Sequence, residues 1–512
     1  MIYIICLILE NFRKIKNWKI FNFENFKWIF WGVGAILKRI IKFNFIFLFL
    51  RVCVCAYDFA FCFCVFNIFM IKFIVIVVFI NFIVLYNNMI IFYYNLCYLF
   101  RFILIFFFMC KDVEWFNIII RLGCNYYSII LVILSFWILG LIFICLREGL
   151  ELKLKLIIFI NMLLVLIIFF IYIDLILFYL IFEIRLIPTF FLIIYWGGNA
   201  ERLRAGYYII MYMLLISFPL LVYIFNMYIY GITIKFSLIV MVMNRYNFSL
   251  WGFLIIYIAF FIKIPIYLFH IWLPKAHVEA PVYGSIVLAG VLLKIGRYGL
   301  IRLIEIFYKV GVKYRYMIFR VGIVGRIIVR ILCLVQIDIK RIVAYSSVVH
   351  INLILCRLIT FYKVGVLGRY VMMISHGLCS SGIFYMVNLY YNRSGRRLLF
   401  LNKGIAGNLP TIIMWWFLFC IINFSFPLSL NFIGETIMLI RIVNWDLRIV
   451  IYLILICFFR RAYSLYLFSY IYHGKNIYYE NKVYNLSIKE YIILVIHYFP
   501  LLIFVLNLIL FI

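Results

Sequence analysis

Apolar residues occur along this chain in long runs that are separated by short polar links. A helix that crosses a bilayer needs about 20 consecutive apolar residues, and the runs have about that length. The pattern predicts an all-α, polytopic transmembrane bundle of about 14 helices. We expect them near residues 61–86, 88–110, 128–146, 154–172, 174–196, 206–230, 248–273, 282–304, 316–336, 341–360, 366–391, 411–440, 447–471 and 488–512.

Two of these helices carry both a proline and an ionisable residue and are expected to be broken. Pro265 follows Lys263 by two residues in the first, and Glu435 follows Pro427 in the second. Proline removes a helical hydrogen bond and opens the backbone. Open backbone is tolerated at membrane depth only where it is buried in protein or lines a wet cavity. In secondary transporters, a broken helix that carries such a group marks the ion path.

The two broken helices lie five spans apart, which suggests an internal repeat of five helices. An odd number of spans places the two copies in inverted orientation, so we expect two inverted five-helix repeats. The predicted parts are a divergent N-terminal extension (1–60), N-terminal transmembrane helices (61–153), a first repeat (154–305), a second repeat (316–471) and a C-terminal helix (488–512).

Composition excludes a soluble fold, because 69% of the residues are hydrophobic whereas globular domains have about 45–50% apolar residues. Abundant Phe, Tyr, Ile, Asn and Lys with only 8 Pro indicate an A+T-rich organellar genome. The net charge of +31 is typical of basic links on one side of a membrane. Its scattered placement argues against nucleic acid as a partner. Basic links occur at 147–155, 201–204, 337–341, 393–403 and 473–482, whereas a basic link at 309–315 breaks the one-sided pattern.

No motif for a nucleotide, haem, flavin or metal is present in the sequence. The two C-x-C pairs, Cys53/Cys55 and Cys62/Cys64, lie in a run rich in Phe and Val, which favours apolar packing over a metal site. We therefore expect no cofactor in this chain. The energy for any ion movement must come from an ion gradient or from a partner subunit.

Glu183 and Lys263 are the first candidates for chemistry, since each is an ionisable residue inside an apolar run. A lone charge at that depth is costly and needs a partner. Burial lowers the pKa of a lysine and a nearby carboxylate raises it, so a Glu183–Lys263 pair predicts a proton-binding site. A static salt bridge is the structural alternative. Glu183 also has alternatives, namely a pair with Arg185 or a cap at the kink of Pro188, although residues two apart on a helix do not face each other.

Lys294, His350, His376 and Glu435 continue this series of intramembrane ionisable groups. Histidine donates and accepts protons near neutral pH, so two histidines on adjacent spans predict a proton relay rather than a zinc site. Each residue also has a structural alternative: Lys294 could snorkel to the interface, the histidines could be ordinary core residues, and Glu435 could cap the opened helix.

His270, His277 and Glu279 follow the first break and are interpreted as residues of an interfacial loop. Support of a helix terminus is the favoured role for them, with proton access as the alternative. His473 and His497 carry no special signal.

The stretch HIWLPKAHVEAPVYGSIVLAGVLLKIGRYGL resembles the antiporter-like membrane subunits of respiratory complex I, NADH:ubiquinone oxidoreductase. The resemblance covers about residues 179–468 and includes FEIRLIPTFFLIIYWGGNAERLRAGYY, DIKRIVAYSSVVH, SHGLCSSGIFY and LNFIGE, in order. Within this family the chain is most similar to subunit 4, because subunits 2 and 5 usually have lysine where Glu435 stands and because the chain lacks length for the lateral helix of subunit 5.

The resemblance implies a fourteen-helix fold with inverted repeats and one proton channel. It implies Glu183 and Lys263 as the input pair, Lys294 as the central link, His350 and His376 as the bridge, and Glu435 as the output site. It also implies the mitochondrial inner membrane, other complex I subunits as partners, especially subunits 2 and 5, and membrane lipids. NADH, FMN, iron–sulfur clusters and ubiquinone would then be bound by partner subunits. The chain would count as part of an H⁺-translocating NADH:ubiquinone reductase while carrying no redox site itself.

Some positions depart from the family pattern. The first 120 residues show no visible match, Arg297 and Phe426 stand where glycine is usual, and one span carries Arg320, Arg326 and Arg330. Two other functions stay open from the sequence alone. One is a multisubunit cation/proton antiporter without a redox partner, and the other is a structural scaffold, although a scaffold does not need six buried ionisable groups.

Overall fold

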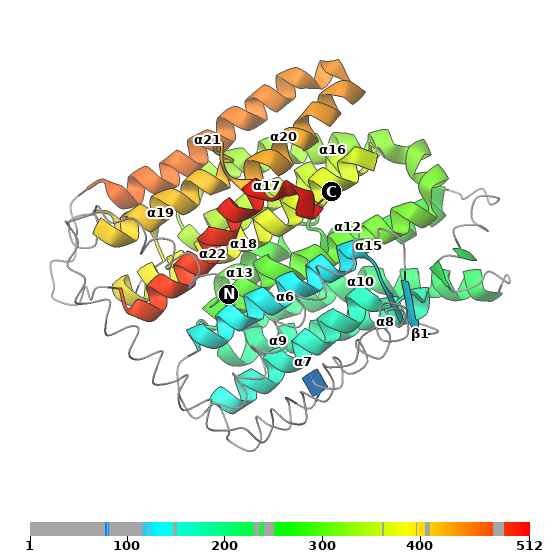
Figure 1. Cartoon of the computed structure of the whole chain (residues 1–512), viewed down its shortest axis with the longest axis horizontal. Helices are drawn as coiled ribbons and strands as arrows, with labels where there is room; N and C mark the ends of the chain where they lie inside the picture. The colour runs from blue at the N-terminus through cyan, green and yellow to red at the C-terminus, as the bar shows by residue number, and fades with distance from the viewer. Residues whose placement is uncertain are drawn as a thin grey trace, which may run out of the picture. The chain divides into compact units, whose positions relative to one another are not determined.

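The computed structural model describes residues 77, 78, 80, 116–119, 122–146, 151–229, 235, 236, 238, 239, 250–360, 363–395, 397–404, 410–474 and 486–511 (Figure 1). The chain divides into two units, Met1–Phe66 and Asn67–Ile512. The predicted extension at 1–60 and nearly all of the helices predicted at 61–86 and 88–110 lie outside the described residues.

The described part is helical, as the sequence predicts, apart from a small antiparallel ladder of β1 (Phe116–Ile119) with β2 (Leu122–Cys124). Eight of its helices are long and apolar enough to cross a membrane. The helices before the first break are α6 (Tyr126–Cys145), α7 (Leu152–Ile171), α8 (Leu175–Ile184), α9 (Leu186–Trp196) and α10 (Arg202–Ile229). The later uninterrupted ones are α16 (Tyr308–Val335), α17 (Ile339–Leu358), α18 (Lys363–Ser394), α21 (Val450–Tyr472) and α22 (Ile488–Leu506).

Capping residues and a proline determine where several helices begin or end. Asn125 forms a capping box with Ser128 at the start of α6, and Ser487 does the same with Glu490 at the start of α22. The predicted span at 174–196 is divided into α8 and α9 at Arg185, three residues before Pro188. Proline has no N–H to donate to the preceding turn, which accounts for the discontinuity.

The first predicted break is present. Helix α12 (Leu250–Lys263) ends at the candidate lysine, and α13 (Trp272–Glu279) begins after a turn in which Leu268 has φ 57°. The indole Nε1 of Trp272 donates to the carbonyl of Ile262 at 3.1 Å. This bond crosses the break and satisfies a carbonyl that the interrupted helix leaves open.

The second predicted break has the same character. Helix α19 (Pro410–Asn423) and α20 (Leu430–Trp445) are joined by a turn with positive φ at Ser425 (60°) and Leu428 (72°). The amide of Asn431 donates to the carbonyl of Ile422 at 3.0 Å. Phe426 itself does not have positive φ, which explains why a large residue is accepted at this position of the turn.

The helix that carries Lys294 is continuous but changes its winding. It runs through α14 (Val282–Val287), a π-helical turn η2 (Leu288–Leu292) and α15 (Leu293–Ile306). The basic stretch at 309–315, which we expected as a link, belongs to the first turns of α16. The apparent exception to the one-sided charge pattern is therefore a helical segment and not a loop.

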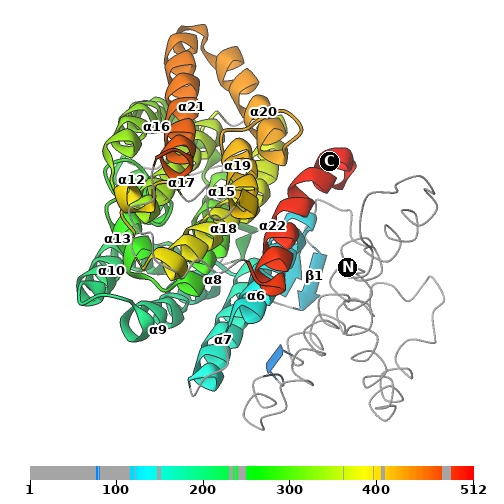
Figure 2. The same ribbon diagram turned by 90° about the vertical axis from the view of Figure 1, so that its left-hand side faces the viewer.

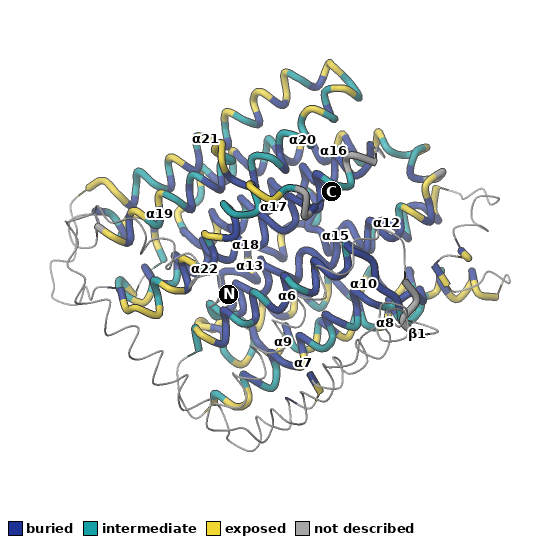
Figure 3. The backbone as a smooth tube through the Cα atoms, viewed as in Figure 1, coloured by how far each residue is buried: buried dark blue, intermediate teal, exposed yellow. Residues whose placement is uncertain are grey.

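Helices α17 and α18 form the centre of the described bundle (Figure 3). All residues in the apolar window of α18 are buried, whereas only 28% are buried in that of α10. Helices α10 and α21 carry exposed apolar side chains along their length, as expected for a surface that faces lipid or another subunit. Helix α22 packs beside α6 and α18, so an element near the C-terminus contacts one from the N-terminal half (Figure 2).

Several helix ends and basic links are joined by polar contacts in the described residues. Trp196 Nε1 donates to Glu151 at 2.6 Å, Arg397 donates to the carbonyl of Val278 at 2.7 Å, and Asp338 forms a β-bridge with Leu398. These contacts join the ends of α7, α9, α13, α17 and α18.

Candidate functional site

Glu183 and Lys263 form an ion pair at the first break. Nζ of Lys263 lies 2.5 Å from Oε1 of Glu183, and the lysine is 2% exposed. The ammonium also lies 3.1 Å from the centre of the Phe182 ring. Helix α8 carries the glutamate and α12 ends at the lysine, so two elements far apart in sequence bring the pair together.

Arg185 takes no part in this ion pair. Its guanidinium donates to the carbonyls of Phe182 at 2.9 Å and Leu292 at 3.2 Å. Arg185 therefore ties the kink between α8 and α9 to the helix of Lys294. The alternative pairing of Glu183 with Arg185 is wrong, because the carboxylate faces α12.

Lys294 lies in the protein interior and does not snorkel to an interface. It is 0% exposed, and its Nζ donates to the carbonyl of Ala289. The π-helical turn contains Ala289, and this turn shifts the carbonyls relative to a regular helix. Nζ also lies 3.4 Å from Nδ1 of His376 on α18. The lysine is thereby held between a backbone carbonyl and an imidazole.

The two candidate histidines, His350 and His376, are in contact. The ring centres of His350 and His376 are 5.2 Å apart, with an angle of 57° between the rings. His376 lies next to Lys294, whereas Nε2 of His350 lies 3.4 Å from the guanidinium of Arg460. The spatial order is Lys294, His376, His350, which differs from the order in sequence.

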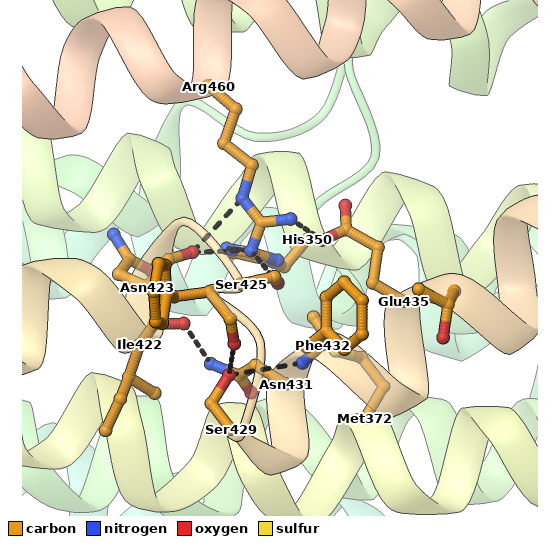
Figure 4. Close-up of polar contacts among 12 residues, drawn as sticks. His350, Met372, Ile422, Asn423, Ser425, Ser429, Asn431, Phe432, Glu435 and Arg460 are labelled. Carbon is orange, nitrogen blue, oxygen red and sulfur yellow. Dashed lines mark hydrogen bonds and ion pairs between the residues drawn. The ribbon is translucent and has the colours of Figure 1, made fainter.

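Glu435 lies at the far end of this series and pairs with two arginines, of which Figure 4 shows Arg460. Its Oε2 contacts Nη1 of Arg460 on α21, and its Oε1 lies 4.0 Å from Arg326 on α16. Glu435 is 4% exposed. It does not act as a local helix cap, since Ser429 caps the start of α20.

Arg460 is the residue of this site that the sequence reasoning missed. Besides Glu435 and His350, it donates to the carbonyl of Asn423 from Nε at 3.1 Å and to the hydroxyl of Ser425 at 2.6 Å (Figure 4). A signal was present in the sequence, because Arg460 and Arg461 interrupt an apolar span. Periodicity alone does not show which arginine points inward.

The described residues do not join every candidate into one chain of contacts. No hydrogen bond or ion pair links Lys263 to Lys294 among them. The two lysines belong to helices that pack closely, because a Cβ built at Gly296 would lie 3.2 Å from the carbonyl carbon of Lys263.

His270 and His277 are not exposed in an interfacial loop, contrary to our expectation. His277 lies within α13, is 0% exposed and stacks on Phe384 with ring centres 4.5 Å apart. His270 lies in the turn before α13, is 8% exposed and stacks on Tyr267. Their burial follows from packing of α13 against α10 and α17.

Three further arginines are buried without a hydrogen-bond partner in the part of the chain that the structure describes. They are Arg297, Arg326 and Arg330, at 1%, 0% and 0% exposure. A buried charge without full compensation costs several kcal/mol. Nothing in the described structure explains Arg297 or Arg330.

No group of three or more His, Cys, Asp or Glu side chains suited to a metal occurs among the described residues. The two C-x-C pairs between residues 53 and 64 lie outside them. The ionisable side chains of the described site can bind and transfer protons.

Family models match most of the chain. The model described as "NADH:quinone oxidoreductase/Mrp antiporter, TM" matches residues 173–459, and that described as "NADH-ubiquinone oxidoreductase chain 4, amino terminus" matches residues 70–173. The second match extends the family resemblance back to residue 70, through a stretch in which no family motif is visible in the sequence.

Curated relatives and solved structures agree with these models. The chain is similar to NADH-ubiquinone oxidoreductase chain 4 of Ceratitis capitata, with 40% identity over 84% of this chain and 97% of the relative. It is also similar to that of Apis mellifera ligustica, with 39% identity over 76% and 86%. The fold resembles a chain of respiratory complex I from Thermus thermophilus with bound NADH, at a TM-score of 0.75, 19% identity and coverage of 84% and 94%. It equally resembles a chain of an archaeal membrane-bound sulfane sulfur reductase, at a TM-score of 0.75, 18% identity and coverage of 84% and 75%.

Proposed function

The chain belongs to the NADH-ubiquinone oxidoreductase chain 4 family, and on this premise we propose that it moves protons through a relay of Glu183, Lys263, Lys294, His376, His350 and Glu435. One observation carries the proposal. The structure joins Lys294, His376, His350 and Glu435 through short contacts in the buried centre of the bundle, with Arg460 between His350 and Glu435.

Pairing of Glu183 with Lys263 controls the input of the relay. Two unit charges about 4 Å apart interact by about 4 kcal/mol at an effective dielectric constant of 20. A charge change near Glu183 that weakens this pair makes the Lys263 ammonium a stronger acid. The lysine then passes its proton toward Lys294.

The histidines carry the proton across the middle of the bundle. Nδ1 of His376 accepts a proton from Nζ of Lys294, and the His376–His350 contact leads it toward Glu435. Each imidazole can take up a proton on one nitrogen and release one from the other. Glu435 is the last carboxylate of the series and releases the proton to the far side.

In this proposal, the chain works within an H⁺-translocating NADH:ubiquinone reductase of the mitochondrial inner membrane. NADH, FMN, iron–sulfur clusters and ubiquinone are bound by other subunits, and subunits 2 and 5 are the expected neighbours together with lipids. The end of the bundle with the basic links faces the matrix, in line with the positive-inside rule.

We also propose the complete fold of about 14 helices with two inverted five-helix repeats. The likeness of the two breaks supports it. In each one, a side chain from beyond the break donates to a carbonyl before it, Trp272 to Ile262 and Asn431 to Ile422.

The test uses the intact complex in proteoliposomes, with NADH oxidation and proton uptake measured together. Lys263→Ala and Glu183→Gln should each lower the number of protons moved per NADH, and Glu183→Asp should retain part of it. Lys275→Ala and Glu201→Gln are matched controls, since both side chains are exposed. Normal stoichiometry in Lys263→Ala would contradict the relay.

A cation/proton antiporter without redox coupling is not favoured, because the relatives named NADH-ubiquinone oxidoreductase chain 4 match over most of this chain. Native electrophoresis of gently solubilised membranes separates the two functions. Migration of this chain with rotenone-sensitive NADH:quinone activity in a very large assembly supports the complex I assignment. Migration in a small complex without that activity would overturn it.

A further inference from the structure

Arg460 contacts three parts of the output site at once, and each contact has a different chemical nature (Figure 4). Nη1 pairs with the carboxylate of Glu435, and Nη2 lies 3.4 Å from Nε2 of His350. Nε and Nη2 donate to the carbonyl of Asn423, at 3.1 and 2.5 Å. The side chain is 3% exposed, so water does not compete for these bonds.

The carbonyl of Asn423 is available because of Pro427. In a continuous helix, the N–H of residue 427 would donate to the carbonyl of residue 423, and proline has no N–H. Arg460 replaces this missing donor from another helix. The hydroxyl of Ser425, in a turn with φ 60°, accepts from Nη2 at 2.6 Å and adds a second anchor.

We propose that Arg460 is a positioning residue that ties the ionisation of Glu435 to the break between α19 and α20. The proposal rests on the proposed relay, in which Glu435 is the last proton carrier. Ionised Glu435 binds one edge of the guanidinium while the break binds the other.

Transfer of a proton from His350 to Glu435 changes which groups hold the guanidinium of Arg460. An N–H bond of the His350 imidazolium breaks and an O–H bond forms on the carboxylate, with the proton carried by bridging water because Arg460 lies between the two side chains. The neutral Glu435 then no longer attracts Arg460 as an ion, and the guanidinium depends on the Asn423 carbonyl and the Ser425 hydroxyl.

No other charged group described near Glu435 links its carboxylate to the break between α19 and α20. Arg326 on α16 lies 4.0 Å from Oε1. Arg330, also on α16, is buried and forms no ion pair with Glu435 among the described residues. His350 on α17 and His376 on α18 belong to the relay itself. Arg460 is the cation that contacts both the carboxylate and the broken helix.

The test compares Arg460→Gln, Arg460→Lys and Ser425→Ala in the intact complex, again with protons per NADH as one readout. The second readout is the infrared band of the protonated Glu435 carboxyl, identified by its loss in Glu435→Gln. Arg460→Gln should increase this band at neutral pH and lower the rate of proton release on the order of tenfold, because the buried carboxylate loses its main counter-charge.

Arg460→Lys should restore the ionised carboxylate but not full pumping, since an ammonium is a point charge and lacks the fork of separate nitrogens with which Arg460 reaches Glu435, Asn423 and Ser425. Ser425→Ala should leave the carboxyl band unchanged and lower pumping by a smaller factor. Arg461→Gln is the matched control, because Arg461 neighbours Arg460 but is exposed.

Unchanged pumping and an unchanged band in Arg460→Gln would overturn the inference. If that variant does not assemble, Arg460→Lys and Ser425→Ala decide, and normal pumping in both overturns it. In either case, loss of pumping in Lys263→Ala would still support the proposed relay, even though the inference about Arg460 had failed. Normal pumping in both Lys263→Ala and Glu435→Gln would instead reject the proposed function itself.

Discussion

Nζ of Lys294 and Nδ1 of His376 lie 3.4 Å apart, although 82 residues separate them in sequence. The contact exists because α18 packs against the π-helical turn just before Lys294, where a Cβ at Gly377 would lie 3.2 Å from the carbonyl of Gly290. Glycine at position 377 thus allows the backbone approach that brings the lysine and the imidazole together.

His376→Asn should interrupt the relay at this contact. Asparagine keeps a polar side chain of moderate size but cannot carry a proton at neutral pH. We expect the number of protons moved per NADH to fall, with the amount of assembled complex unchanged. His473→Asn is the control, because His473 is exposed at the end of α21. Equal stoichiometry in the two variants would remove His376 from the relay.

Gly299 allows α15 to pack against α12, and its replacement tests that packing. A Cβ at Gly299 would lie 2.4 Å from the ring of Phe260, whereas one at Gly140 meets no atom within 4 Å. Gly299→Ala should destabilise the protein by about 1–3 kcal/mol through overpacking. Gly140→Ala should be neutral or stabilise by up to about 1 kcal/mol, since alanine favours helix.

The melting temperature of this subunit, measured by thermal unfolding of the purified complex in detergent, reports the stability of both glycine variants. A lower melting temperature for Gly140→Ala than for Gly299→Ala would contradict the described helix contact.

Arg330 is 0% exposed, and its guanidinium has no hydrogen-bond partner among the described residues. Arg330→Met removes a buried charge and keeps much of the volume. We expect a gain in stability of about 1–4 kcal/mol, as found when buried charges are replaced by apolar residues. Arg448→Met, at an exposed position, should change stability little. The melting temperature of the complex in detergent measures this change. A lower melting temperature in Arg330→Met would indicate that the guanidinium has a stabilising partner.

Glu151 provides a pH-dependent contact outside the membrane spans. The hydrogen bond from Trp196, followed by that from Lys155, holds the pKa of the Glu151 carboxyl below its ordinary value. A lowered pKa means that the contact contributes its stability above the ordinary carboxyl pKa of about 4.3 and loses it as the pH falls through the lowered pKa. Near neutral pH the contact should be insensitive to pH.

Tryptophan fluorescence measures this contact, with Trp196→Phe subtracted to isolate the signal of Trp196. The signal should stay constant from about pH 5 upward and change only in stronger acid. Glu151→Gln should remove the acid transition. A transition near neutral pH would show that Glu151 does not control this tryptophan.

The sequence determined the transmembrane class, most of the described helices and both breaks, because these depend on local chemistry. A run of about 20 apolar residues is long enough to cross a membrane, and Pro265 and Pro427 each remove a donor from the helical hydrogen bonding. The sequence also singled out Glu183, Lys263 and Glu435, since an ionisable residue in an apolar run is costly without a partner.

Only the tertiary structure decided which groups meet. It placed His376 rather than His350 beside Lys294, turned Glu183 toward Lys263 and away from Arg185, and buried His277 inside α13. It also brought Arg460 from α21 to Glu435 and to the carbonyl that Pro427 leaves open. These contacts join residues that are far apart in sequence. They depend on how whole helices pack, and the local pattern of residues does not contain that information.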